Sequence, residues 1–369
     1  MTERMKRYRQ KHRVRINRSL RLRRMGLAQA HAGRLLVRLT QLDGTLPNLA
    51  LMRLASFHRT RGDDVVLSRS PYRSPIEPRY DHVYGAAIFS YSANRVARLK
   101  AEFPSAVIGG TWDAANTVTV EDVIGDHVGV DYSLWPDFTA SLGFTQRGCR
   151  LRCGFCVVPR KEGTPHAVAT IADIWRGRPW PRHLHLLDND FFGQPVEQWR
   201  PRIDEIRKGR FRVSFTQGVN PRAITPETAA ALASVDYRDD QFKVRRLYTA
   251  WDNLGDERVF FRGVEMLTAA GITPHHLLAY MLVGYDRRET WERVLYRFHR
   301  MADIGIRPFP MVYGERRRGL PCDGVAGLAD KTLGQFQRWA VRRLYTVTPF
   351  AEYDASARSE ALNRGHPGR

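Results

Sequence analysis

Three cysteines within eight residues constrain this chain more than any other feature of its sequence. Cys149, Cys153 and Cys156 follow the spacing C-x3-C-x2-C, and no other stretch holds a comparable cluster of metal ligands. Three thiolates on one loop can hold three irons of a [4Fe–4S] cluster, which leaves the fourth iron open to a small molecule. An ordinary ferredoxin cluster or a structural zinc site uses four protein ligands. The spacing therefore predicts a cluster that binds a substrate or cofactor at its free iron.

This cysteine loop resembles that of the radical S-adenosylmethionine (radical SAM) enzymes. An aromatic residue usually precedes the third cysteine in that family, and Phe155 stands at this position. The resemblance implies that the open iron chelates the amino and carboxylate groups of SAM, with Phe155 shaping the SAM pocket. It further implies that the reduced cluster cleaves SAM to methionine and a 5′-deoxyadenosyl radical, which modifies an unactivated carbon centre.

A zinc loop is the alternative for the same three cysteines. Cys322 or a nearby histidine would then supply the fourth ligand, and the chain would be a non-catalytic zinc or iron–sulfur protein that binds nucleic acid. The C-x2-C half fits zinc well, but the x3 spacing before it and the aromatic residue are much less usual there. The sequence therefore favours the cluster of an enzyme.

Length and cysteine content indicate the class of protein. The 369 residues suggest about two domains, and no run of 18 apolar residues predicts a membrane span. Four cysteines, three of them clustered, fit a reducing compartment better than a disulfide framework. The N-terminus has no apolar signal region. We therefore expect a cytoplasmic protein that makes no use of a membrane.

The basic charge of the chain is concentrated at its N-terminus. The net charge is +21, and the first 24 residues hold eleven basic side chains against Glu3 alone. We expect residues 1–30 to form a disordered basic arm whose partner is a nucleic acid. The alternatives are a solubilising tail, a start codon assigned too early, or an organelle transit peptide.

Strand and helix patterns alternate after this arm. They predict strands at 34–40, 65–67, 82–89 and 106–108 and helices at 48–58 and 93–102, which indicates an open Rossmann-like parallel sheet at 31–130. The helix start Leu46-Pro47-Asn48-Leu49-Ala50 and the turn Gly109-Gly110 resemble the cobalamin-binding domain of many radical SAM proteins. That domain often supplies a histidine after its first strand, whereas the loop 41–47 here has none. Cobalamin and a degenerate supporting domain both remain open.

Six strand and helix repeats follow the predicted linker at 132–137. The first strand is 142–145, and five more are expected at 183–187, 212–216, 245–249, 277–283 and 308–312. Helices are expected at 194–208, 226–235, 256–270, 288–303 and 331–346. This α/β pattern predicts a partial (β/α)6 TIM-like barrel at 131–320 and a C-terminal helical extension at 321–369. The site of such a barrel lies at the carboxyl ends of its strands.

Polar residues follow the second and third predicted strands. The resemblance implies that Asp188 and Asn189 occupy the stretch that binds the SAM amino group, although the two glycines usual there are missing. An Asx turn that caps the next helix is the alternative. Gln217 and Asn220 end the third strand, where they suit ribose hydroxyls or the methionine carboxylate. Arg222 could pair with that carboxylate.

The last two strands end in stretches that resemble the adenine-binding segments of the family. Gly284 lies in a glycine-containing motif after the fifth strand, and Met311 lies at the end of the sixth. The resemblance therefore covers residues 140–315. It implies a reductant such as flavodoxin or ferredoxin as partner. With cobalamin the expected reaction is methyl transfer to carbon, and the arm points to a nucleoside or nucleic acid as substrate.

The cysteine count limits the subfamily. The run that follows Cys156 is similar to that of methylthiotransferases, but those enzymes need three more cysteines for a second cluster. Only Cys322 is left over, so we exclude a second cluster of this kind.

Overall fold

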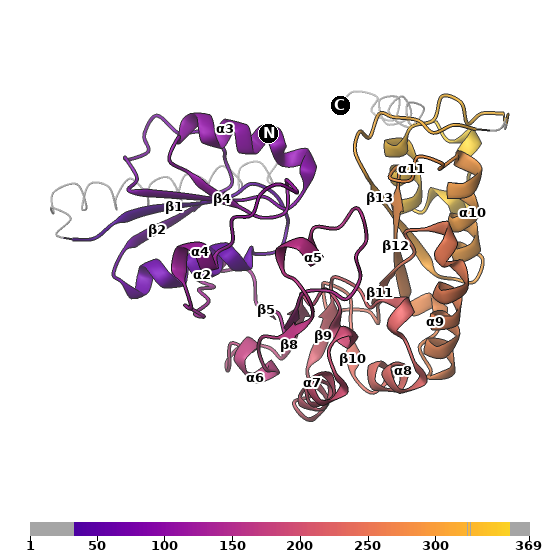
Figure 1. Cartoon of the computed structure of the whole chain (residues 1–369), viewed down its shortest axis with the longest axis horizontal. Helices are drawn as coiled ribbons and strands as arrows, with labels where there is room; N and C mark the ends of the chain where they lie inside the picture. The colour runs from indigo at the N-terminus through magenta and orange to yellow at the C-terminus, as the bar shows by residue number, and fades with distance from the viewer. Residues whose placement is uncertain (1–32, 323, 325, 355–369) are drawn as a thin grey trace, which may run out of the picture. The chain divides into compact units, whose positions relative to one another are not determined.

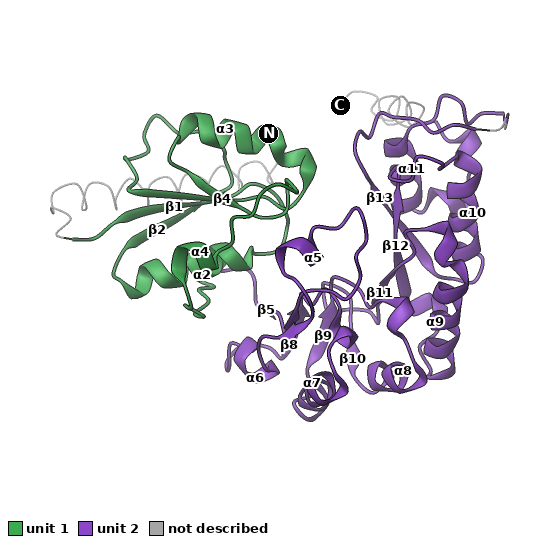
Figure 2. Ribbon diagram, in the orientation of Figure 1, with its two compact units in different colours: residues 1–135 green, residues 136–369 purple. Residues whose placement is uncertain are grey.

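The computed structural model describes residues 33–322, 324 and 326–354, and the chain divides into two compact units, 1–135 and 136–369 (Figure 2). The predicted basic arm at 1–30 lies outside the described residues. Among the described residues, none of the helices has the length and apolar character needed to cross a membrane.

Four parallel strands form the sheet of the first unit, in the order β2-β1-β3-β4. Helix α3 covers one face of this sheet, whereas α2 and α4 cover the other (Figure 1). Asn48 starts α2, because its side-chain oxygen accepts from the Leu51 amide at 3.2 Å. The elements are β1 Leu36–Gln41, α2 Leu49–Thr60, β2 Asp64–Ser68, β3 His82–Ala86, α3 Ala93–Glu102, β4 Val107–Gly109 and α4 Glu121–Ile124.

Two parallel sheets form the second unit. Their strand orders are β10-β9-β8-β5 and β11-β12-β13. The Val219 amide donates to the Tyr248 carbonyl at 2.8 Å, which joins the end of β9 to β11. A short antiparallel pair, β6 with β7, flanks the cysteine loop. The strands are β5 Ser141–Gly143, β6 Gln146–Arg147, β7 His166–Ala167, β8 His183–Leu186, β9 Arg212–Phe215, β10 Asp236–Tyr237, β11 Leu247–Ala250, β12 Leu277–Val283 and β13 Arg307–Val312.

Amphipathic helices cover the outer faces of these sheets (Figure 1). Threonines at 170, 225, 290 and 332 accept from backbone amides and start four of the helices. Trp291 and Phe298 of α10 and Phe336 and Trp339 of α11 are fully buried and pack together. The helices are α5 Val158–Lys161, α6 Ile171–Ile174, α7 Val196–Lys208, α8 Pro226–Ala233, α9 Glu257–Ala269, α10 Trp291–Ala302 and α11 Leu333–Val341.

The mixed α/β class with mostly parallel sheets is confirmed. Each strand expected from the sequence is present, with bounds that differ by a few residues. The sequence did not indicate β6, β7 or β10, because a two-residue strand has no periodic pattern to detect. Helix α11 belongs to the apolar core of the second unit, since Leu333, Phe336 and Trp339 are buried in it.

Candidate functional site

The three clustered cysteines lie on the loop between β6 and α5. All three are free thiols that are half-buried. This loop follows β5, whose carboxyl end points the same way as those of β8 and β9, because these strands pair in parallel. The polar residues after each strand therefore lie on the edge of the sheet that carries the cysteine loop.

Glu162 closes the base of the cysteine loop. One of its carboxylate oxygens accepts from the Gly148 amide at 3.1 Å and from the Asn189 side-chain nitrogen at 2.8 Å. The other pairs with Arg147 at 3.2 Å. Next to it, the Cys149 amide donates to the Gly163 carbonyl at 3.2 Å. Asn189, for which contact with a cofactor stays a prediction, thus also helps to hold the loop, and Glu162 was not a predicted site residue.

The thiols share a partly desolvated and negatively charged environment. Burial, together with the charges of Asp190, Cys156 and Cys153, raises the pKa of Cys149 to about 11. Burial also raises the pKa of Cys156, with Cys153 and Asp252 adding to the effect. The Leu151 amide donates to the Cys149 sulfur at 3.4 Å. Three thiolates on this loop would repel one another, and a bound cation would offset this repulsion.

Two arginines lie against this group of thiols. Arg150 forms a bidentate pair with Asp190, with nitrogen–oxygen distances of 2.9 and 3.2 Å, and an Asp190 oxygen lies 4.0 Å from the Cys149 sulfur. Arg222 follows β9, and one of its nitrogens lies 3.9 Å from the Cys153 sulfur. Arg222 therefore lies near a cysteine sulfur, whereas Arg150 pairs with the carboxylate beside another cysteine.

Asp188 presents an unpaired carboxylate oxygen at the end of β8. Its Oδ1 accepts from the Thr145 hydroxyl at 2.7 Å and from the Gln146 amide. Its Oδ2 is buried and has no hydrogen-bond partner within the described part of the chain. Burial raises the pKa of Asp188 to about 7. A buried acceptor without a donor is costly, and a bound cationic group would satisfy it.

Asn220 presents an unpaired donor at the end of β9. Its Oδ1 accepts from the Arg222 amide at 3.1 Å, whereas its Nδ2 is buried and lacks a partner among the described residues. Gln217, two residues after β9, is exposed. Asp188 and Asn220 thus offer one acceptor and one donor, from neighbouring parallel strands. This pair suits the ammonium and carboxylate of an amino acid.

Gly284 directly follows β12 with a positive φ of 86°, and both its amide and its carbonyl are hydrogen-bonded. Its amide donates to Glu289, and its carbonyl accepts from Arg318. Glu289 pairs with the buried Arg297, whose guanidinium also donates to the Leu282 carbonyl at 2.9 Å. This buried network fixes the end of β12 next to the site.

Phe155 and Met311 lie at different points of the candidate site. The Phe155 ring meets Tyr285 edge-on, with centroids 5.4 Å apart, which joins the cysteine loop to the end of β12. Met311 on β13 is 37% exposed, so its side chain is free to contact a ligand.

Cys322 is half-buried and packs against the apolar core of the second unit. Among the described residues, no three histidine, cysteine or acidic side chains are already gathered around one metal position. The donor set on the loop nevertheless fits an iron–sulfur cluster, because it supplies three thiols and neighbouring unpaired polar atoms. It would take Cys149, Cys153 and Cys156 as ligands.

In the first unit, the polar groups after the strands hydrogen-bond to other residues of the same unit. The Asp43 carboxylate after β1 accepts from the amides of Ile88 and Phe89, at 2.9 and 3.0 Å, and from the Ser92 hydroxyl at 2.7 Å. A side chain at Gly110 would come within 1.8 Å of the Ala87 carbonyl, so that glycine approaches its own backbone and not a ligand. These residues do not fit a cobalamin with an imidazole ligand.

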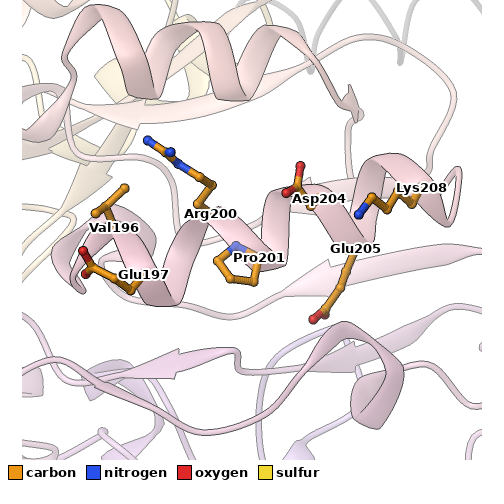
Figure 3. A pocket seen from close by; sticks show the side chains of 7 residues that line it. All are labelled: Val196, Glu197, Arg200, Pro201, Asp204, Glu205 and Lys208. Atoms are coloured by element: carbon orange, nitrogen blue, oxygen red, sulfur yellow. The ribbon is translucent and has the colours of Figure 1, made fainter.

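A hollow of about 530 Å³ lies along the exposed side of α7 (Figure 3). One helix supplies all of its lining, which is Val196, Glu197, Arg200, Pro201, Asp204, Glu205 and Lys208. The lining mixes both signs of charge and contains no thiol or histidine. We therefore place the functional site at the cysteine loop and not in this hollow.

Comparison with known proteins does not assign this chain to a family, so its functional interpretation rests on the geometry described above. No protein-family model matches the chain, and no curated protein matches it either.

Proposed function

We propose that this chain is a radical SAM enzyme that modifies an unactivated carbon centre. Cys149, Cys153 and Cys156 would hold a [4Fe–4S] cluster with one open iron. When bound, this cluster supplies the electron that cleaves SAM reductively to methionine and a 5′-deoxyadenosyl radical. A low-potential donor such as flavodoxin or ferredoxin would reduce it, and a reducing cytoplasm would protect it.

One observation carries this proposal. Three thiols on one loop share an edge of the sheet with two buried, unpaired polar atoms, Asp188 Oδ2 and Asn220 Nδ2. A structural zinc site has no use for such atoms, because its four ligands complete the metal. An amino acid bound at an open iron would use both.

The residues around the thiols have separable tasks. Asp188 Oδ2 accepts a hydrogen bond from the SAM ammonium, and Asn220 Nδ2 donates to its carboxylate. Glu162 and Asn189 keep the loop closed at its base. Phe155 excludes water from one side of the thiols, while Gln217, Gly284 and Met311 remain the candidates for the ribose and adenine.

The finer architecture belongs to the same proposal. We propose that β5, β8, β9, β11, β12 and β13 are the six strands of a partial (β/α)6 barrel. The parallel pairing within both sheets and the Val219–Tyr248 hydrogen bond between them support this arrangement. The first unit would be a Rossmann-like domain that supports the enzyme without cobalamin.

Electron paramagnetic resonance of the anaerobically reconstituted, reduced protein tests the proposal. We expect a [4Fe–4S]⁺ signal that shifts when SAM is added, and the same signal in Cys322→Ser. A Cys153→Ser variant should lose the signal. Bound zinc without a cluster, or a cluster that responds to Cys322→Ser and ignores SAM, would show instead a structural metal site.

A further inference from the structure

Two neighbouring loops beside the candidate site carry the same kinds of residue. The loop after β12 begins Gly284-Tyr285-Asp286-Arg287-Arg288, and the loop after β13 reads Tyr313-Gly314-Glu315-Arg316-Arg317-Arg318. Because β12 and β13 pair in parallel, both loops leave the same edge of the sheet. Each therefore presents one tyrosine followed closely by a run of arginines.

The two tyrosines touch each other and the cysteine loop. The rings of Tyr285 and Tyr313 lie 5.0 Å apart, edge to face, and Tyr285 also meets Phe155 at 5.4 Å. Tyr285 is 40% exposed and Tyr313 is 47% exposed, so a large part of both rings faces solvent. A ligand that stacked on these rings would lie next to the thiols.

Three arginines of the two loops lack an ion-pair partner among the residues that the structure describes. Arg287, Arg316 and Arg317 are exposed and have no ion-pair partner within the ranges that the structure describes. Arg288 lies 3.6 Å from Asp286. Arg318 is different, because its guanidinium donates to the Gly284 carbonyl and so ties the two loops together.

We propose that Tyr285, Tyr313, Arg287, Arg316 and Arg317 form a surface that binds a single-stranded nucleic acid. Exposed aromatic rings stack on unpaired bases, and flanking arginines pair with the phosphates of the same strand. This inference rests on the proposed function, since it assigns the substrate of the cysteine site to the class of nucleic acids. It draws on described residues alone and is independent of the N-terminal arm.

The charge and geometry favour this ligand over other partners. A small anion would need the arginines alone and would leave the exposed tyrosines unused. An apolar protein surface would bury the three unpaired guanidinium groups at a high cost. A nucleic-acid strand can contact both kinds of residue, because each nucleotide places a base for the tyrosines close to a phosphate for the arginines.

Fluorescence anisotropy with a labelled 20-nucleotide single-stranded RNA tests the surface in the full chain. Tyr285→Leu/Tyr313→Leu keeps apolar contact with Phe155 but removes both rings, and should weaken RNA binding by about tenfold or more. The same variant should bind inorganic polyphosphate as the wild type does. Tyr285→Phe/Tyr313→Phe should retain RNA binding, because it keeps both rings.

The arginines are tested in the same assay. Arg316→Ala/Arg317→Ala should weaken binding of both RNA and polyphosphate, and should lower the salt slope for RNA by about 1.4, or roughly 0.7 for each lost phosphate contact. The matched control is Arg200→Ala/Lys208→Ala on α7, which removes the same charge far along the sequence from both loops (Figure 3). Tyr296→Ala on α10 controls for the loss of an exposed tyrosine.

Three results would overturn the inference. The first is that Tyr285→Leu/Tyr313→Leu binds RNA as tightly as the wild type does. The second is that this variant loses RNA binding and polyphosphate binding to the same extent. The third is that Arg200→Ala/Lys208→Ala lowers the salt slope as much as Arg316→Ala/Arg317→Ala does. Failure here is separable from failure of the proposed function. The resonance shift caused by SAM requires no RNA, and RNA binding requires no cluster.

Discussion

One guanidinium nitrogen of Arg222 lies 3.9 Å from the sulfur of Cys153. The same nitrogen lies 3.4 Å from the Asp256 carboxylate, so Arg222 bridges a cysteine of the loop and an acid at the start of α9. Because Arg222 lies in the short turn Pro221–Ala223 after β9, the end of this strand places a positive charge beside the predicted cluster.

Removing this charge should make the cluster harder to reduce. We expect Arg222→Ala to lower the midpoint potential by roughly 40 mV or less, which corresponds to about 1 kcal/mol for a half-exposed ion pair. Resonance-monitored redox titration measures this shift. Arg222→Lys should recover part of it, and Arg200→Ala on α7 should leave the potential unchanged. A higher potential in Arg222→Ala would contradict the prediction.

Glu162 should decide whether the cysteine loop can assemble a cluster. Glu162→Ala removes the acceptor for the Gly148 amide and for the Asn189 side chain, at a cost of about 2 kcal/mol in local stability. We expect it to take up less iron on reconstitution than the wild type, as measured by iron and sulfide analysis. Glu227→Ala, which removes an exposed partner of Arg200, is the control and should reconstitute fully. Full iron uptake by Glu162→Ala would show that the loop needs no such anchor.

Asp188 should make stability depend on pH. Burial raises its pKa from 3.8 to about 7, so between these values the folded protein holds a proton that the unfolded chain releases. Stability therefore falls as pH rises through this window, by up to about 1.4 kcal/mol for each pH unit. The side chain of Asp188→Asn stays neutral and keeps an Oδ1 acceptor. The free energy of unfolding of this variant should therefore rise relative to that of the wild type between pH 5 and pH 8. Urea unfolding at both values measures the difference.

An exposed aspartate provides the comparison for that experiment. Asp204 on α7 is 39% exposed, and the stability of Asp204→Asn at pH 5 and pH 8 provides the baseline for an exposed site. If Asp188→Asn behaves in the same way, Asp188 is ionised in the folded protein at pH 5.

Removing one member of the buried ion pair between Glu289 and Arg297 should strongly lower the free energy of unfolding. Arg297→Met leaves the Glu289 carboxylate buried with the Gly284 amide as its remaining donor, so we expect a loss of about 3–5 kcal/mol in the free energy of unfolding. Glu289→Gln/Arg297→Met should lose less than the sum of the two single variants. Chemical denaturation of all three measures this coupling. Arg200→Met should cost about 1 kcal/mol at most, and additive losses would argue against a coupled pair.

Local patterns made much of the fold predictable. The run Leu277–Val283 is apolar throughout, and β12 is buried along most of its length, as a central parallel strand should be. The cysteine spacing likewise predicted directly which loop is the candidate functional site. Asp188 and Asn220 were predicted because they follow such strands, and their contact with a cofactor stays a prediction that their unpaired atoms support.

Contacts between distant residues were beyond this kind of prediction. The sequence singled out Asn189 as a cofactor contact but did not show that its side-chain nitrogen donates to Glu162, 27 positions earlier. The partners of Asp43 lie 45 or more positions away, so the sequence shows a loop without histidine and not the carboxylate that fills it. A periodic sequence pattern does not indicate which carboxylate accepts a hydrogen bond from which amide.

The carboxylate of Asp43 also makes the loop after β1 complete without a ligand. By occupying the amides after β3, it lets the first unit complete its fold with its own atoms. The cysteine loop has no such internal substitute, since its thiols repel one another once ionised. Under the proposed function, a shortage of iron would therefore leave the cysteine loop incomplete, whereas the contacts that Asp43 makes in the first unit require no metal.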